Sequence, residues 1–307
     1  MSEAVDRRSL VAAGFTVLFW ASAFVAIRDA GESYSPGALA LGRLLSGSAV
    51  LVLILLVRRE GWPPRAAWPG ILASGLLWFG VYMIALNWGE REVDAGTAAM
   101  VVNVGPVLIA LLSGWLLREG FPRRVLAGIG VSFAGAVVVG FSTSGGGSAS
   151  VLGVVLCVVA AATYAIGVTS QKPALRHASA VQVTTFGCLV GAVACLPFAG
   201  QLVSEAGAAP LSATLDVVYL GVFPTALAFI TWAYALARTT AAKMGATTYA
   251  VPAIVIVMSW LLLDEVPGWL TLAGGVLCLA GVAITRARPR RRSGAPAPAE
   301  PSATAAT

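Results

Sequence analysis

Charged side chains are scarce in this chain of 307 residues. Only 11% of the residues are Asp, Glu, Lys or Arg, whereas 58% are hydrophobic, and the mean hydropathy is +0.85. Soluble domains carry about 25% charged residues, and a soluble chain of this length would need a charged shell around its cores. Because 20 basic and 14 acidic side chains cannot cover such a surface, the composition excludes a soluble enzyme.

The residues that commonly build catalytic and metal sites are also few. His177 is the only histidine, so a zinc site or a Ser-His-Asp triad lacks its usual components. No Gly-x4-Gly-Lys-Ser/Thr motif is present, which excludes an ATP-driven pump. The cysteines lie within apolar runs without a Cys-x-x-Cys motif, which indicates packing residues: Cys157, Cys188, Cys195 and Cys278. We therefore expect no enzyme activity, no metal and no cofactor.

Long apolar runs dominate the chain. A hydrocarbon core about 30 Å thick needs roughly 20 apolar residues per helix, and lipid favours helices because they satisfy their own backbone polar groups. Ten runs meet this requirement: 10–27, 36–57, 67–88, 95–117, 124–141, 151–170, 180–199, 212–236, 243–263 and 266–285. We predict an all-α integral membrane protein with ten transmembrane helices. The basic tail over 286–307, rich in Arg, Pro and Ala, is predicted to be disordered.

Basic residues fall on one side of this predicted membrane protein. If the N-terminus is cytoplasmic, 17 of the 20 Lys and Arg lie in the inner segments, Arg28 and Arg91 lie outside, and Arg43 lies within a span. Such an excess marks cytoplasmic segments. The distribution predicts a multi-pass protein of the cell membrane with both termini cytoplasmic. The net charge of +6 then indicates contact with an anionic inner leaflet rather than nucleic acid.

The two halves of the chain repeat each other at a shift of 146 residues. Pro106 aligns with Pro252 and Glu119 with Glu265, and ten of the 30 positions 106–135 are identical. Residues 10–141 and 151–285 each hold five predicted spans, an odd number, so the second unit enters the membrane inverted. We therefore predict an inverted 5+5 repeat, with a site near the midplane between the halves and transport by alternating access.

Several motifs resemble the EamA-type branch of the drug/metabolite transporter superfamily. They are FWASAF at 19–24 with Arg43, Pro106 followed by LLRE at 116–119, Gly221 followed by TALA at 225–228, and Pro252 followed by LLLDE at 261–265. The resemblance covers 10–285 and implies two EamA units, cytoplasmic termini and movement of small metabolites. We interpret the chain as an exporter of amino acids or related metabolites. The alternative is a transporter-like scaffold or regulatory protein without transport activity.

Polar candidates for substrate binding lie near the middle of the predicted spans. Arg43 is an intramembrane cation, which either anchors a substrate carboxylate or serves as a hydrogen-bonding hub for neighbouring helices. Asn103 and Tyr249 occupy equivalent repeat positions, one turn before Pro106 and Pro252. Each proline removes a backbone hydrogen bond, so we predict kinks or hinges there. A polar side chain beside such a kink suits a binding site, and local polar packing is the alternative.

Aromatic side chains are predicted to form the walls of the same site. Several share one helix face at a spacing of four residues, and the full set is Trp20, Phe24, Trp78, Tyr82, Tyr164 and Trp232. Apolar walls with few polar groups suit amphipathic solutes such as amino acids, and a helix-packing seam is the alternative. The expected partners are a small-molecule substrate and the lipid bilayer, with the chain either a monomer or a homodimer.

Overall fold

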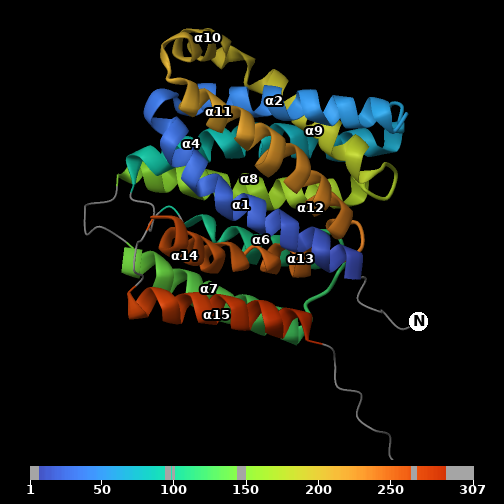
Figure 1. The fold of residues 1–307 in the computed structure, drawn as a ribbon. Helices are drawn as coiled ribbons and strands as arrows, with labels where there is room; N and C mark the ends of the chain where they lie inside the picture. Colours follow the sequence, from blue (N-terminus) through green and yellow to red (C-terminus); the bar gives the residue numbers. More distant parts are fainter. Residues whose placement is uncertain (1–6, 94–97, 99–100, 144–149, 264–267, 288–307) are drawn as a thin grey trace, which may run out of the picture.

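The computed structural model describes residues 7–93, 98, 101–143, 150–263 and 268–287, and all regular structure in these ranges is helical (Figure 1). Six helical runs are long and apolar enough to cross a membrane, and a seventh qualifies if the bent pair Ala180–Ala194 and Leu196–Ala208 is one span. The chain is therefore an all-helical, multi-pass membrane protein, as predicted. The predicted tail lies outside the described residues from position 288 onward.

Most helices follow the predicted apolar runs. The first half contains α1 (Arg7–Ser33), α2 (Pro36–Val57), α3 (Trp68–Ser74), η2 (Gly75–Val81), α4 (Tyr82–Glu92), α6 (Gly105–Leu116) and α7 (Arg123–Thr143). The second half contains α8 (Val151–Ala174), α9 (Ala180–Ala194), α10 (Ala199–Ala208), α11 (Leu211–Leu220), η4 (Gly221–Leu227), α12 (Ala228–Leu236), α13 (Ala241–Thr247), α14 (Ala250–Leu263) and α15 (Trp269–Arg286). Two single 3-10 turns, η1 (Arg65–Ala67) and η3 (Leu196–Phe198), precede α3 and α10.

The third and eighth predicted spans each contain one π-helical segment, at equivalent positions. These segments, η2 and η4, are offset by the 146 residues of the sequence repeat. Each begins with a glycine: a Cβ on Gly75 would lie 2.8 Å from the Gly187 carbonyl of α9, and one on Gly221 would lie 2.6 Å from the Arg43 carbonyl of α2. The two glycines therefore let each π-helical segment contact the backbone of a helix from the other half of the chain.

The helices α7 and α15 form a close glycine-mediated pair. A Cβ on Gly135 would lie 2.6 Å from the Gly274 carbonyl, and one on Gly128 would lie 2.6 Å from the Gly281 carbonyl. Because the lower-numbered glycine of α7 meets the higher-numbered glycine of α15, the helices run antiparallel. Small residues at such an interface allow backbones to approach closely in a membrane.

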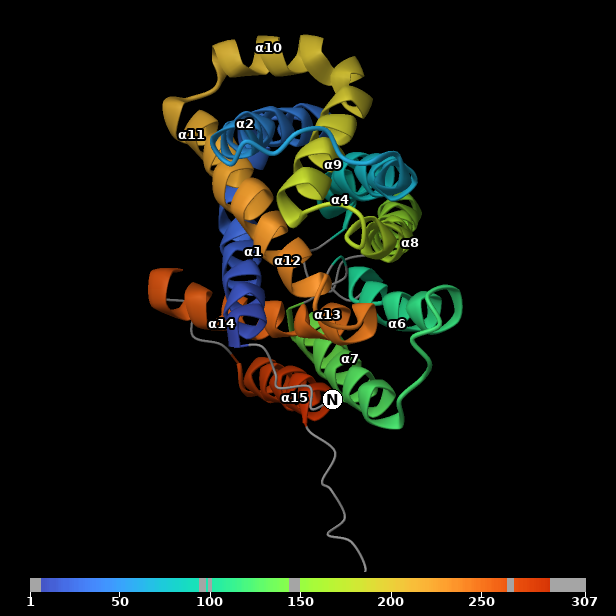
Figure 2. The same cartoon turned by 90° about the vertical axis from the view of Figure 1, so that its right-hand side faces the viewer.

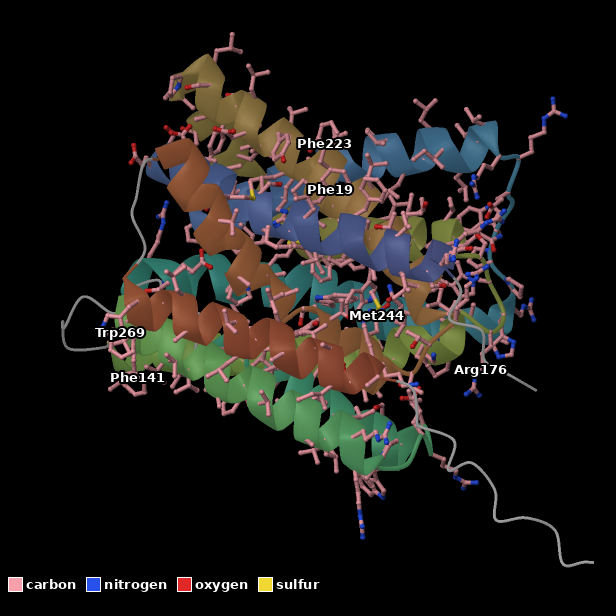
Figure 3. The ribbon with its side chains drawn as sticks, turned by 60° about the horizontal axis from the view of Figure 1, so that its bottom comes forward. Phe19, Phe141, Arg176, Phe223, Met244 and Trp269 are labelled. Atoms are coloured by element: carbon pink, nitrogen blue, oxygen red, sulfur yellow. The ribbon has the colours of Figure 1, made fainter. Side chains whose placement is uncertain are left out.

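The centre of the same helix pair is held by two reciprocal hydrogen bonds. Ser132 Oγ donates to the Cys278 carbonyl over 3.0 Å, and Cys278 Sγ donates to the Ser132 carbonyl over 3.5 Å. These two residues are related by the 146-residue shift. In Figure 3, Phe141 near the end of α7 and Trp269 at the start of α15 lie at the same end of the bundle, as an antiparallel pair requires.

The fourth and ninth predicted spans are broken helices. In the ninth, α13 ends at Thr247 and α14 begins at Ala250, so Pro252 lies in the first turn of the new helix. In the fourth, Asn103 lies in a turn immediately before α6, and Pro106 lies in the first turn of α6. Proline is tolerated in a first turn because its missing N–H has no intrahelical partner there. Each break therefore precedes its proline.

The helix α10 is an element that hydropathy did not predict. The run 180–199 reads as one span, but α9 ends at Ala194 and the chain bends by 53° into the segment that contains α10. Glu205 of α10 accepts a hydrogen bond from the Ser35 backbone N–H over 2.8 Å and so satisfies a free amide at the start of α2. In Figure 2, α10 lies across the top of the bundle, next to α2 and α11.

Candidate functional site

Aromatic rings from four helical segments meet in the interior of the bundle. The Trp20 ring of α1 lies 5.0 Å from Trp232 of α12 and 6.1 Å from Trp78 of η2, measured between ring centroids. Trp78 also contacts Phe229 at 4.7 Å and Tyr164 of α8 at 5.3 Å. Trp78 and Trp232 are almost fully buried, at 1% and 0% exposed. These five residues are called the central aromatic cluster below.

Local sequence explains how α8 fits into the central aromatic cluster. A Cβ on Gly167 of α8 would lie 2.5 Å from Trp78 Cβ, and a Cβ on Gly105 of α6 would lie 2.6 Å from the Tyr164 ring. The two glycines therefore make room for large rings between closely spaced helices. Tyr82 extends the cluster along α4, with its half-buried ring 5.8 Å from that of Tyr164.

Two of the predicted site residues, Arg43 and Trp20, are hydrogen-bonded to η4. Arg43 is 6% exposed, and its Nε donates to Thr225 Oγ1 over 3.2 Å. Thr225 in turn donates to the Leu220 carbonyl over 2.8 Å. Trp20 Nε1 donates to the Pro224 carbonyl over 3.1 Å. These contacts agree with the hub interpretation of Arg43, since both side chains hold the π-helical segment in place.

Tyr249 and Asn103 contact each other outside the central aromatic cluster. The Tyr249 hydroxyl donates to the Asn103 carbonyl over 2.8 Å, so the two broken spans meet at equivalent positions. The Tyr249 ring is 0% exposed and lies in a cluster with residues of α6, α7, α13 and α15. This arrangement agrees with the packing alternative for Tyr249. The Asn103 side chain is half-buried.

Two buried donors of the central aromatic cluster have no hydrogen-bond partner among the described residues. They are the Trp232 indole Nε1 and the Tyr164 hydroxyl. Buried polar groups are almost always paired with protein, water or a ligand. The cluster therefore combines apolar walls with two unused donors, which is the composition of a site for an amphipathic solute.

A charged clamp joins three helix ends at one end of the bundle. Both carboxylate oxygens of Glu119, in the loop after α6, accept from the Ala241 backbone N–H at 2.9 and 3.0 Å, at the start of α13. Lys172 Nζ lies 3.9 Å from Glu119 Oε1. The ammonium also donates to the Leu236 carbonyl over 2.7 Å and to the Thr239 carbonyl. We call this group the Lys172–Glu119 clamp.

The predicted site residues thus fall into three groups. The structure brings together Trp20, Trp78, Tyr82, Tyr164 and Trp232; it places Arg43 beside η4; and it places Asn103 and Tyr249 at the helix breaks before Pro106 and Pro252. The side chain of Phe24 lies outside the described residues.

Two contributors were missing from the predicted site, namely Phe229 and Thr225. The sequence nevertheless places both on one helix face with Trp232, because Thr225 and Phe229 are four residues apart and Trp232 follows three residues later. Among the described residues, no group of three or more His, Cys, Asp or Glu side chains could hold a metal ion.

Comparisons with known proteins agree with this architecture. The model of the "EamA-like transporter family" matches residues 8–141 and 151–287. The chain is 35% identical over 277 residues to a "Probable terminal-alkyne amino-acid exporter" of Streptantibioticus cattleyicolor, covering 89% of this chain and 91% of that protein. It is 34% identical to the "Uncharacterized transporter YdfC" of Bacillus subtilis, covering 87% of each chain.

A more distant relative and one solved structure extend the comparison. The chain is 24% identical to a "Probable amino-acid metabolite efflux pump" of Salmonella typhimurium, covering 91% of this chain and 95% of that protein. A crystal structure of a protein with 22% sequence identity superposes with a TM-score of 0.75, covering 91% of this chain and 96% of the other. The last likeness concerns the fold alone.

Proposed function

Because this chain belongs to the EamA-like transporter family, it is a membrane transporter of small molecules and not an enzyme, and we propose that it exports amino acids or related metabolites. The observation that carries the proposal is the central aromatic cluster, where buried rings from both halves surround two unused hydrogen-bond donors. Apolar walls with a few polar groups suit an amino acid that has an apolar side chain. Two relatives bear names of amino-acid or amino-acid-metabolite exporters, which supports the same substrate class.

The proposed architecture is an inverted repeat of ten spans, with units at 10–141 and 151–285. A twofold axis in the membrane plane would exchange each residue with the one 146 positions away. Under that exchange the Gly128–Gly281 contact becomes the Gly135–Gly274 contact, and both are present. The π-helical segments at equivalent positions and the reciprocal Ser132–Cys278 bonds follow the same exchange. Such self-complementary contacts are the signature of twofold symmetry.

The proposed orientation places both termini in the cytoplasm and the basic tail against the inner leaflet. The distribution of Lys and Arg supports it. The start of α1 and the end of α15 lie at the same end of the bundle (Figure 1), as an even number of spans requires. Arg176, which belongs to a predicted inner loop, lies at this end as well (Figure 3).

Alternating access through the central aromatic cluster is the proposed mechanism. The Lys172–Glu119 clamp ties the loop after α6, in the first unit, to α8 and α13 of the second. On the proposed orientation it closes the inner end. Broken helices at the fourth and ninth spans provide segments that can tilt separately, as in other inverted-repeat transporters. Export requires the clamp to open so that substrate reaches the cluster from inside.

Transport by purified protein in liposomes tests the function. Labelled L-leucine, L-phenylalanine, L-threonine and L-cysteine are offered to protein-containing and protein-free vesicles, and we expect at least one to enter faster with protein. Tyr82→Ala should lower that rate about tenfold, because it removes a half-buried ring beside Tyr164. The matched control is Trp88→Ala, on the same helix but 45% exposed, which should keep the rate.

The same assay separates the two candidate functions. If neither these amino acids nor a broader metabolite panel moved across the membrane with folded protein, the scaffold or regulatory alternative would replace transport. Equal losses in the two variants would contradict the placement of the site.

A further inference from the structure

The two unused donors of the central aromatic cluster differ from the other polar groups around it. Trp20 Nε1 and Arg43 Nε are both engaged by η4, whereas Trp232 Nε1 and Tyr164 Oη have no partner within the described residues. Trp232 is 0% exposed and Tyr164 is 6% exposed. Burying a donor without an acceptor is costly, so these two positions call for a group that the protein itself does not provide.

The chemistry of the two side chains defines that group. An indole N–H can only donate, and a phenolic hydroxyl donates readily, so both are satisfied by one kind of partner, a hydrogen-bond acceptor. The Thr248 hydroxyl lies near Tyr164 and donates to the Gly245 carbonyl over 2.7 Å, and the Tyr164 hydroxyl makes no hydrogen bond to it or to any other described residue. Both rings contact Trp78, whose centroid lies 5.4 Å from that of Trp232 and 5.3 Å from that of Tyr164, so the two donors belong to residues that pack against the same ring.

We propose that Trp232 Nε1 and Tyr164 Oη hold the carboxylate of the transported amino acid, while Arg43 acts as a structural brace. The inference rests on the proposed function and names the recognition chemistry of that site. Hydrogen bonds to a carboxylate are stronger than those to neutral acceptors, and a dry apolar surrounding strengthens them further. Two neutral donors can also bind the carboxylate and release it again, because they lack the positive charge of a cationic side chain, which would hold the anion more tightly.

The position of Tyr164 connects carboxylate binding to movement. Its ring contacts Gly105 at the start of α6, next to one helix break, while Trp232 belongs to the continuous run that contains η4. A carboxylate held by both side chains therefore joins α8, which packs against the start of α6, to the eighth span. Substrate binding would then favour one arrangement of the broken helices over another.

Two substitutions test the two donors individually. Trp232→Phe and Tyr164→Phe each remove the donor and keep an aromatic ring. The probes are L-leucine and L-leucinamide, in which a neutral amide replaces the carboxylate, or the panel amino acid that is carried fastest with its own carboxamide. We expect each variant to weaken the apparent affinity for the acid about tenfold or more and that for the amide less than threefold.

A matched control variant and a second measurement, made on wild-type protein, accompany these affinities. Tyr34→Phe removes a hydroxyl that is bonded to Thr214 Oγ1 in a separate core cluster, and it should leave both affinities unchanged. In wild-type protein labelled with 15N at its indole groups, one buried indole resonance should shift when L-leucine is added and not when L-leucinamide is added. This readout does not depend on the folding of a variant.

Three results would overturn the proposal. Equal weakening for acid and amide would show that the donors hold a water molecule or support packing, and unchanged affinities would show that they play no part in binding. A selective loss for the acid in Arg43→Gln, absent in Trp232→Phe and Tyr164→Phe, would make Arg43 the anchor. If wild-type protein carried none of the panel, the proposed function itself would fail, which is a separate outcome.

Discussion

Replacing Gly135 with leucine is expected to abolish the folded, monodisperse protein. A Cβ at this position would lie 2.6 Å from both the Gly274 carbonyl oxygen and the Cys278 backbone nitrogen of α15. Backbone atoms of a packed helix cannot move aside as a flexible side chain can, so α7 and α15 would have to separate along the whole pair. Overpacking typically costs about 1–3 kcal/mol, and we expect this contact to exceed that range because it also breaks the reciprocal Ser132–Cys278 bonds.

Gly130→Leu is the matched control on the same helix. Gly130 is exposed, and a Cβ there would meet nothing within 4 Å. Size-exclusion chromatography and thermal unfolding in detergent should show a normal peak and melting temperature for Gly130→Leu. For Gly135→Leu they should show an absent peak, or a melting temperature lowered by about 10 °C or more. Similar behaviour of the two variants would contradict the close helix pair.

Lys172→Met is expected to open the clamped end of the bundle and to lower transport about tenfold. The ammonium group lies 3.9 Å from Glu119 Oε1 and donates to the carbonyls of Leu236, the last residue of α12, and of Thr239 in the turn after it. Its removal therefore breaks the links from α8 to the loop after α6 and to this turn. Transport falls because an alternating-access carrier must close one end before it opens the other. The conformational equilibrium shifts toward the open inner end by the free energy of the lost contacts.

A reporter cysteine at Met244 measures this opening directly. Met244 of α13 is 0% exposed and belongs to the main core (Figure 3), and the four native cysteines are buried, which keeps background labelling low. Met244→Cys should react with a water-soluble maleimide about tenfold faster when combined with Lys172→Met. Arg176→Met, an exposed cation just beyond α8, is the control and should leave the rate unchanged. Equal rates in all backgrounds would contradict a gating role for the clamp.

The large-scale organisation could be predicted from the sequence because the relevant signals are local or periodic. Apolar runs revealed membrane helices, and a constant shift of 146 residues revealed the repeat. Aromatic residues four positions apart share a helix face, so the spacing of Trp78 and Tyr82 is sufficient to place them on one wall. These inferences require only helix geometry and the solvent preference of side chains.

Other features depend on contacts that no local pattern encodes. The π-helical segments arise where Gly75 and Gly221 meet the other half of the chain, and hydropathy is unchanged there. The bend into α10 and the reach of Glu119 to Ala241 depend on the arrangement of distant segments. Among the described residues Trp232 Nε1 has no hydrogen-bond partner. This depends on how the interior packs, because the sequence alone does not show which carbonyl an indole N–H can reach.

Counterflow in proteoliposomes tests the central claim most directly, namely that this chain carries amino acids by alternating access. Vesicles are loaded with unlabelled L-leucine, or the panel amino acid carried fastest, and diluted into a trace of the same compound in labelled form. An alternating-access carrier returns from each outward step with labelled substrate, so we expect the label to accumulate transiently above its equilibrium level, and to do so far less with Lys172→Met. Monotonic equilibration of the label would indicate a passive pore, and an absence of entry with folded protein would contradict transport of that substrate altogether.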